Sequence, residues 1–137
     1  ILNRKAQICR QEGIEFTGDF LFPAGFGIEA FELGILLNNA LDNAIEACRK
    51  VEQGRRLIRL RSYGKGRMFF LVVENGYDGK PTKEEGGVCR TTKRDAQLHG
   101  IGMKNMKSCV ERYFGTMEYE TRQGIFVLTL MLQAEEG

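Results

Sequence analysis

The chain has 137 residues, of which 42% are hydrophobic and 28% are charged, and its formal net charge is +2. These values are typical of one ordinary globular domain, which we expect to span residues 1–137. No apolar run approaches the ~20 residues that a membrane-spanning helix needs. So small a net charge gives no indication of nucleic-acid binding, and neither a membrane nor a nucleic acid is an expected partner of this chain.

The first half of the chain predicts two helices and a strand. Apolar residues recur at helical spacing over residues 1–11, and residues 14–17 alternate like a strand. A loop with several glycines follows at 19–27, and a long amphipathic helix is expected over 28–53. Because the sequence begins inside the first helix and without methionine, we expect the chain to be a piece of a longer protein.

The second half predicts four strands and one further helix. Strand-like runs at 57–63 and 68–74 are close enough in sequence to form a hairpin. Residues 76–99 lack sustained periodicity and are rich in glycine and charge, which is typical of a functional lid. A helix that opens on a Gly-Ile-Gly motif follows, and residues 116–131 predict a terminal hairpin. This order favours helices layered on one face of a mixed sheet.

The cysteines are far apart in the sequence, and none forms a CxxC pair. Two of them occupy apolar positions of expected helices. This pattern predicts reduced, partly buried thiols in a cytosolic protein. The cysteines are Cys9, Cys48, Cys89 and Cys109.

The most informative feature of the sequence is a pair of asparagines in the long helix. At 100° per residue, Asn39 and Asn43 fall on a narrow polar stripe beside a broad apolar face. Their amide oxygens, one helical turn apart, can reach a common point next to the helix. A neutral oxygen suits a hard cation such as Mg²⁺ that arrives already carrying phosphate charge. The pattern therefore favours a nucleotide site.

Two other features offer contacts for the phosphates of a nucleotide. Gly100 and Gly102 lie at the start of the expected third helix, where glycine permits a close approach and free amides favour an anion. Thr91, Thr92 and Lys93, in the expected lid between two arginines, offer hydroxyls and a cation. Taken alone, the glycines are more often plain turn chemistry, and the lid segment is as often a solvated basic loop.

A polar side chain at the end of the strand expected over residues 68–74 is placed to contact a base. Asn75 directly follows the apolar strand, and its side-chain carbonyl can accept a hydrogen bond from an exocyclic amine. If the phase of the strand is shifted by one residue, Glu74 serves the same purpose. The plain alternative is a tight turn with Asn75 and Gly76 at its tip.

In this order, the motifs resemble the ATP-binding domain shared by gyrase, heat-shock chaperone, histidine kinase and mismatch-repair ATPases, the Bergerat fold. Residues 39–47, 91–93 and 99–106 look most like the catalytic domains of bacterial sensor histidine kinases, closest to the quorum-sensing peptide-receptor type. The resemblance covers nearly the whole chain. It implies an α+β fold: a two-layer α/β sandwich in which a mixed, mostly antiparallel sheet of about five strands is covered on one face by three helices.

The resemblance also assigns roles to individual residues. Asn39 matches the family's Mg²⁺-chelating asparagine, and Asn43 matches a second catalytic asparagine that contacts the nucleotide phosphates. Asn75, or Glu74 in the shifted register, matches the adenine-reading acidic residue. The remaining residues that the resemblance places at the ATP site are Thr92, Lys93, His99, Gly100, Gly102 and Met103.

The function that the resemblance implies is that of a protein-histidine kinase. Such a domain binds Mg²⁺-ATP and donates the γ-phosphate to a histidine on a separate dimerisation domain, and so acts indirectly on a response regulator. The acceptor histidine is expected outside this chain, because His99, the only histidine, lies within the phosphate region and the nucleophile must approach from outside. The implied setting is the cytoplasmic part of a membrane-bound bacterial sensor protein.

Two departures from the family pattern keep other functions open. Asn75 or Glu74 replaces the usual adenine-binding aspartate, and Ile35 stands where many relatives carry an acidic residue or a histidine near the γ-phosphate. The second departure argues against strong ATP hydrolysis. One alternative is a docking module of the same fold that no longer binds nucleotide. The other is a serine kinase that regulates a transcription factor, which would want an acidic residue near Ile35.

Overall fold

The structure is a computed structural model that describes residues 2–21, 25–77, 89–90 and 93–133, and for 89–90 and 93–101 it describes the backbone alone. The helices are α1 (Leu2–Gln11), α2 (Ala30–Arg49) and α3 (Lys93–Arg112), with a short 3-10 turn, η1 (Gln53–Arg55), after α2. The strands are β1 (Glu15–Asp19), β2 (Leu57–Lys65), β3 (Met68–Gly76), β4 (Cys89–Arg90), β5 (Thr116–Arg122) and β6 (Ile125–Gln133).

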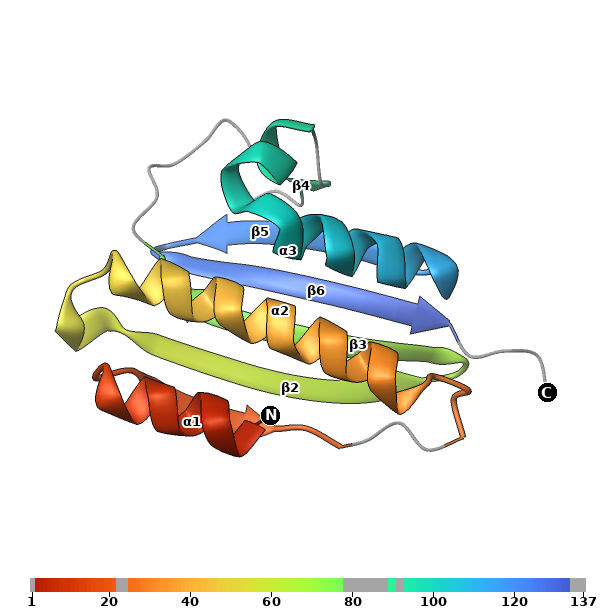
Figure 1. The fold of residues 1–137 in the computed structure, drawn as a ribbon, viewed down its shortest axis with the longest axis horizontal. Helices are drawn as coiled ribbons and strands as arrows, with labels where there is room; N and C mark the ends of the chain where they lie inside the picture. Colours follow the sequence, from red (N-terminus) through yellow and green to blue (C-terminus); the bar gives the residue numbers. More distant parts are fainter. Residues whose placement is uncertain (1, 22–24, 78–88, 91–92, 134–137) are drawn as a thin grey trace.

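These elements form two layers, with the three α-helices on one face of a single sheet (Figure 1). The strand order is β1-β2-β3-β6-β5-β4. The β1–β2 pair is parallel and all other neighbouring pairs are antiparallel. The expected sandwich with a mixed, mostly antiparallel sheet of about five strands is therefore confirmed, and the two-residue β4 adds a sixth strand at one edge.

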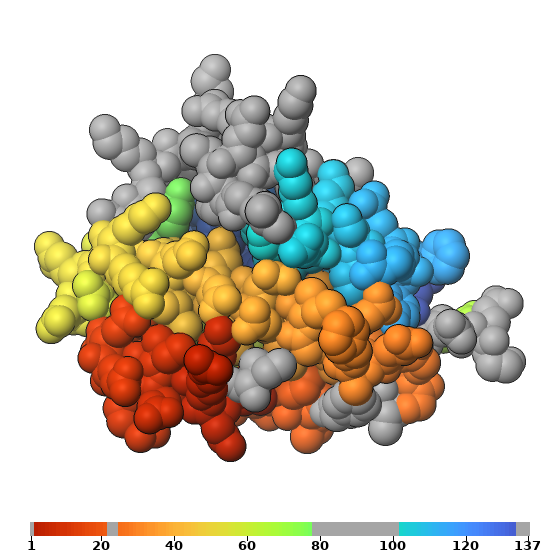
Figure 2. All heavy atoms as spheres, viewed as in Figure 1, coloured from red at the N-terminus to blue at the C-terminus, as the bar shows by residue number. Residues whose placement is uncertain are grey.

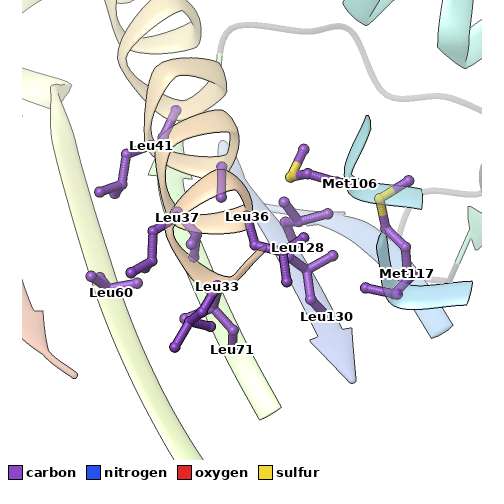
Figure 3. Close-up of a cluster of buried hydrophobic side chains, with 14 of the residues drawn as sticks. Leu33, Leu36, Leu37, Leu41, Leu60, Leu71, Met106, Met117, Leu128 and Leu130 are labelled. Atoms are coloured by element: carbon purple, nitrogen blue, oxygen red, sulfur yellow. The ribbon is translucent and has the colours of Figure 1, made fainter. Parts of the chain in front are cut away.

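The hydrophobic core lies between α2 and the sheet. The strands alternate, so that every second residue points toward the helices, and the apolar stripe of α2 covers those residues (Figure 3). The central contacts are made by Leu33, Leu36, Leu37 and Leu41 of α2 with Leu60, Leu71, Leu128 and Leu130 of the strands. Each such side chain contributes about 1.5–3 kcal/mol through burial. None of the helices in the described ranges is long and apolar enough to span a membrane.

Polar contacts tie α1 to α2. Lys5, which is only 8% exposed, forms an ion pair with Asp42 on α2. Nearer the end of both helices, the guanidinium of Arg49 donates two hydrogen bonds, of 2.6 and 2.7 Å, to the carboxylate of Glu12. The first helix is thus bonded to the helix that carries the asparagine pair.

The described thiols, Cys9 among them, are buried and free, as expected from their spacing.

The start of α3 differs from the expectation. The helix was expected to open at Gly100, but it begins at Lys93, so both Gly100 and Gly102 lie inside it. The physical reason is local propensity, because most of the residues from 93 to 98 are good helix formers and outweigh a cost of about 1 kcal/mol for each glycine. The free amides of the first turn therefore belong to residues 93–96 and not to the glycines. Thr91, Thr92 and most of the expected lid lie outside the described residues.

Candidate nucleotide-binding site

The contact between α2 and α3 is built on an asparagine and a glycine. Asn39 is half-buried, and its Nδ2 donates a 3.0 Å hydrogen bond to the backbone oxygen of Ile35, one turn earlier in α2. This bond fixes the carboxamide so that its Oδ1 points toward α3, where a Cβ added to Gly102 would lie 3.3 Å from that oxygen. Glycine at this position leaves room for the carboxamide. The structure thus brings together two of the residues that the sequence singled out.

Asn43 lies one turn further along α2 and is also half-buried. Its side chain makes no hydrogen bond to any described residue, so its amide group remains available to a ligand. Figure 2, viewed from the helix side, shows a hollow between the C-terminal half of α2 and α3, where the dark blue of the C-terminal strands is visible. Both asparagines are partly exposed, so neither side chain is enclosed by the hydrophobic core.

Asn75 lies beneath α2 and is almost completely buried, at 1% exposed. It is a residue of β3, paired with Ile58 on one side and Phe126 on the other, and its position in the alternation is that of the core residues. Its Nδ2 donates a 2.7 Å hydrogen bond to the backbone oxygen of Gly76. Within the described part of the chain, nothing donates a hydrogen bond to its side-chain oxygen. A buried carbonyl without a donor is costly, by about 1–3 kcal/mol, unless a ligand or water supplies one.

Glu74 lies on the opposite face of the sheet. Its carboxylate is 3.7 Å from the guanidinium of Arg59, its cross-strand neighbour on the face without helices. A shift of one residue along a strand moves every side chain to the other face. Of the two residues considered from the sequence, Asn75 is therefore the one that lies on the same side as α2, and the tip-of-turn alternative is wrong because Asn75 is inside a strand.

The floor of the site beside Asn75 is made by a close backbone approach. A Cβ at Gly76 would lie 2.4 Å from the backbone oxygen of Arg55 in η1, so only glycine fits there. Cys48, at the end of α2, donates a 3.4 Å hydrogen bond to the backbone oxygen of Leu57. Burial raises the pKa of the Cys48 thiol, and hydrogen bonds to the backbone of Leu57 and Gly76 partly offset this effect. No sequence motif predicts that Cys48 lies next to Gly76, because the two residues come from different elements.

The other residues expected at the site fall into two groups. Met103 is 1% exposed and belongs to the hydrophobic core, so it supports α3 from inside. Gly100, Lys93 and His99 are on the N-terminal part of α3, where the side chains are outside the description. Among the described residues, no three His, Cys, Asp or Glu side chains are grouped as a metal site would need.

A polar network that sequence reasoning missed holds α3 against α2. Tyr113 donates a hydrogen bond to Glu32 and accepts one of 3.2 Å from the backbone N–H of Glu29. The guanidinium of Arg112 lies 2.7 Å from the same carboxylate. The hydrogen bond from Tyr113, followed by the interactions with Arg112, lowers the pKa of Glu32. These residues are 80 positions apart in sequence and carry no motif, so only the fold reveals them.

This network makes stability depend on pH. A carboxyl whose pKa is lower in the folded state than in the unfolded state, where it is about 4.3, stabilises the fold above that value and loses its effect as the pH falls through the folded pKa. We expect Glu32→Gln to lower the free energy of unfolding at pH 7 and to flatten its decline between about pH 5 and pH 3. Urea denaturation across this range measures both effects. Glu46→Gln, which removes an exposed carboxylate from the same helix, is the matched control, and equal pH profiles for wild type and Glu32→Gln would contradict the prediction.

Comparison with solved structures places this arrangement in a class. The catalytic domain of the histidine kinase ThkA matches with a TM-score of 0.71 at 18% identity, covering 97% of this chain and 93% of that one. A second crystal form of ThkA gives 0.72 at 20% identity, covering 96% and 86%. The histidine kinase AdeS of Acinetobacter baumannii gives 0.69 at 13% identity, covering 98% of this chain and 61% of that one. The fold is that of histidine kinase catalytic domains.

The family model for the GHKL domain matches residues 28–133, and the chain therefore belongs to the GHKL family. This confirms the resemblance to the ATP-binding domains named from the sequence motifs. The quorum-sensing receptor type within the histidine kinases remains a prediction. A search of curated proteins found no match to the chain.

Proposed function

We propose that this domain binds Mg²⁺-ATP and is the catalytic domain of a sensor histidine kinase. The observation that carries the proposal is the side-chain oxygen of Asn75, which is buried beneath α2 and receives no hydrogen bond from the described residues. An exocyclic amine such as that of adenine is a donor that would satisfy this oxygen. GHKL membership and the fold of the solved kinases support the same reading. We further propose one domain over residues 1–137, with a lid at 76–99, from the cytoplasmic part of a membrane-bound sensor.

The asparagines of α2 fit a magnesium ion that arrives with ATP. Mg²⁺ prefers oxygen donors, and when it carries a triphosphate it needs few protein ligands. Asn39 offers an oriented neutral oxygen, since its Nδ2 is held by Ile35, and Asn43 offers a second free amide. A bound Mg²⁺ would neutralise charge that develops on the phosphates. Asn39 is thus the expected metal ligand, and Asn43 is the expected contact to the phosphates.

The chemical step requires little from the protein beyond positioning. A ring nitrogen of a histidine on a separate dimerisation domain attacks the γ-phosphorus, the bond to the bridging oxygen of ATP breaks, and ADP leaves. Ile35 provides no general base to activate a competing water. The site is therefore better suited to transfer than to hydrolysis. The phosphorylated histidine of the partner would then pass its phosphoryl group to a response regulator.

Calorimetry with Mg²⁺ and a non-hydrolysable ATP analogue tests the proposal. We expect one binding site per chain and no incorporation of labelled phosphate into the chain alone. Transfer is expected when a dimerisation segment with its histidine is added in trans. The absence of binding in a folded sample would favour a docking module of the same fold, and transfer to serine instead of histidine would favour the serine-kinase alternative.

Gly102→Ala tests the contact between α2 and α3. The added methyl would lie 3.3 Å from Oδ1 of Asn39, which cannot retreat freely because its Nδ2 is bonded to Ile35. Alanine is also favoured over glycine inside a helix by about 1 kcal/mol. We therefore expect thermal stability to be kept or raised while the affinity for Mg²⁺-ATP falls about tenfold. Unchanged affinity in calorimetry would show that the carboxamide does not contact the ligand complex.

A further inference from the structure

The face of the sheet that carries no described helix has a regular distribution of charge. Its residues alternate along each strand with those of the core. In the registers of the four long neighbouring strands, they form three rows that run β2, β3, β6, β5 across the sheet. The rows are Arg59, Glu74, Val127, Glu120; then Arg61, Val72, Thr129, Glu118; then Tyr63, Phe70, Met131, Thr116.

The two outer strands of these rows have opposite charge. On this face β2 presents the two arginines of the first two rows, and β5 presents two glutamates, with Arg122 beside Glu120 at the end of the strand. Between them the two central strands carry mainly uncharged side chains, of which Val72 and Val127 are already covered by their neighbours, at 3% and 7% exposed. Tyr63 stacks on Phe70 with ring centroids 4.8 Å apart, and it remains 44% exposed. Arg61 lies over the same tyrosine ring, which confirms that its side chain is on this face.

This distribution of charge is complementary to the same face of a second copy of the chain. A two-fold axis parallel to the strands, placed over the centre of the sheet between β3 and β6, stacks β2 of one copy on β5 of the other and keeps each row at its own height. Arg61 then meets Glu118 of the second copy, and Arg59 meets Glu120. An axis perpendicular to the strands would instead stack arginine on arginine. The charges therefore favour one arrangement of two copies over the other.

We infer that the open face of the sheet is a docking surface for a second copy of this chain, in this face-to-face arrangement. Stacked sheets pack about 10 Å apart, and their strands cross at an angle of about 30°. This angle shifts β2 of one copy along β5 of the other by about 4 Å, a displacement that arginine and glutamate side chains can span. Two of the four charges also have partners within one copy. Arg59 pairs with Glu74, and Glu120 pairs with Arg122. Asp19 of β1 is in register with Arg61, and Arg90 of β4 is in register with Glu118. The same axis stacks β1 on β4, so the arrangement opposes unlike charges at the edges of the sheet as well.

The dimer is expected to be weak. From the spacing between strands and the rise per residue, the three rows cover about 500 Å² per copy. A stable interface buries about 800 Å² per partner, so this contact is smaller. The dissociation constant is therefore expected between micromolar and millimolar, and association should weaken as added salt shortens the Debye length below about 10 Å.

A charge-swap experiment on the whole chain tests the arrangement. Arg61→Glu places two pairs of like charges across the interface, and so does Glu118→Arg. We expect each variant alone to associate at least about tenfold more weakly than the wild type. In an equimolar mixture of the two variants, both contacts between the unlike chains become attractive again, so the mixture should associate as well as the wild type. Sedimentation velocity from about 10 μM to about 1 mM, the range suited to so small an interface, measures all three samples.

Matched controls make the same charge changes on the helix side. Lys107→Glu and Glu111→Arg alter exposed residues of α3 and should leave association unchanged. Circular dichroism and melting curves establish that each variant is folded. A wild-type chain that stays monomeric over the whole range, a mixture that fails to restore association, or controls that weaken it equally would each overturn the inference.

Discussion

Asn39→Ala should lower the affinity for Mg²⁺-ATP at least about a hundredfold, which corresponds to about 2.7 kcal/mol. The substitution removes a side-chain oxygen that is oriented by a bond within α2 and directed toward Gly102. The fold should change little, because the hydrogen bond that is lost joins Asn39 to its own helix and a typical bond contributes about 1 kcal/mol. Calorimetry and a melting curve on the same sample separate the two effects.

Asn38→Ala is the matched control for this experiment. Asn38 is the neighbouring asparagine in α2, but it is exposed, and its Nδ2 lies 3.5 Å from a carboxylate oxygen of Asp42. We expect the affinity for the nucleotide to stay within about twofold of the wild type. If both variants lose binding equally, the loss reflects the helix and not the amide, and the assignment of Asn39 as a metal ligand is wrong.

Gly115→Ala should be the most damaging glycine-to-alanine change among the glycines that the structure describes. A Cβ at this position would lie 1.7 Å from the backbone oxygen of Met131 and 3.1 Å from the Cα of Leu132. Neither atom can move away, since Gln133 donates a 3.0 Å hydrogen bond to the oxygen of Tyr113 and so ties β6 to the end of α3. We expect a loss of more than about 4 kcal/mol, a large part of the about 5–15 kcal/mol that stabilises a domain. Urea denaturation, or circular dichroism if the variant is largely unfolded, measures it.

Gly54→Ala provides the contrast. No atom lies within 4 Å of a Cβ added at Gly54, and its φ is outside the left-handed region. The same change should therefore leave stability within about 1 kcal/mol and tend to raise it, because alanine restricts the unfolded chain. A similar loss in both variants would mean that the close approach at Gly115 is relieved by a movement of the backbone.

The sequence predicted the layers of this fold because hydrophobic periodicity is local. The apolar stripe that ends at Cys48 and the polar stripe with Asn39 are both visible in one segment of 20 residues, and α2 has the expected faces. The start of α3 could not be predicted in the same way. There, two opposing local signals compete, because glycine disfavours a helix while most of the residues that precede it favour one.

The chemistry at the end of β3 could not be settled from the sequence for a different reason. The choice between Asn75 and Glu74 depends on the phase of one strand, and a run with apolar residues on both faces does not reveal its phase. The pairing of Asn75 with Phe126 settles which face it occupies. The hydrogen bond between Tyr113 and Glu32 joins segments that are distant in sequence and depends on how two helices pack. No local sequence pattern therefore predicts it.

The ion pair between Lys5 and Asp42 indicates that the residues of α1 cannot be removed without cost to the rest of the domain. The family model matches from residue 28, yet α1 and β1 precede that point. Deleting them would strip one edge from the sheet, open the core around Cys9, and leave Asp42 on α2 without its cation. A fragment that begins at residue 28 is therefore expected to unfold more readily than the whole chain, which melting curves of the two would measure.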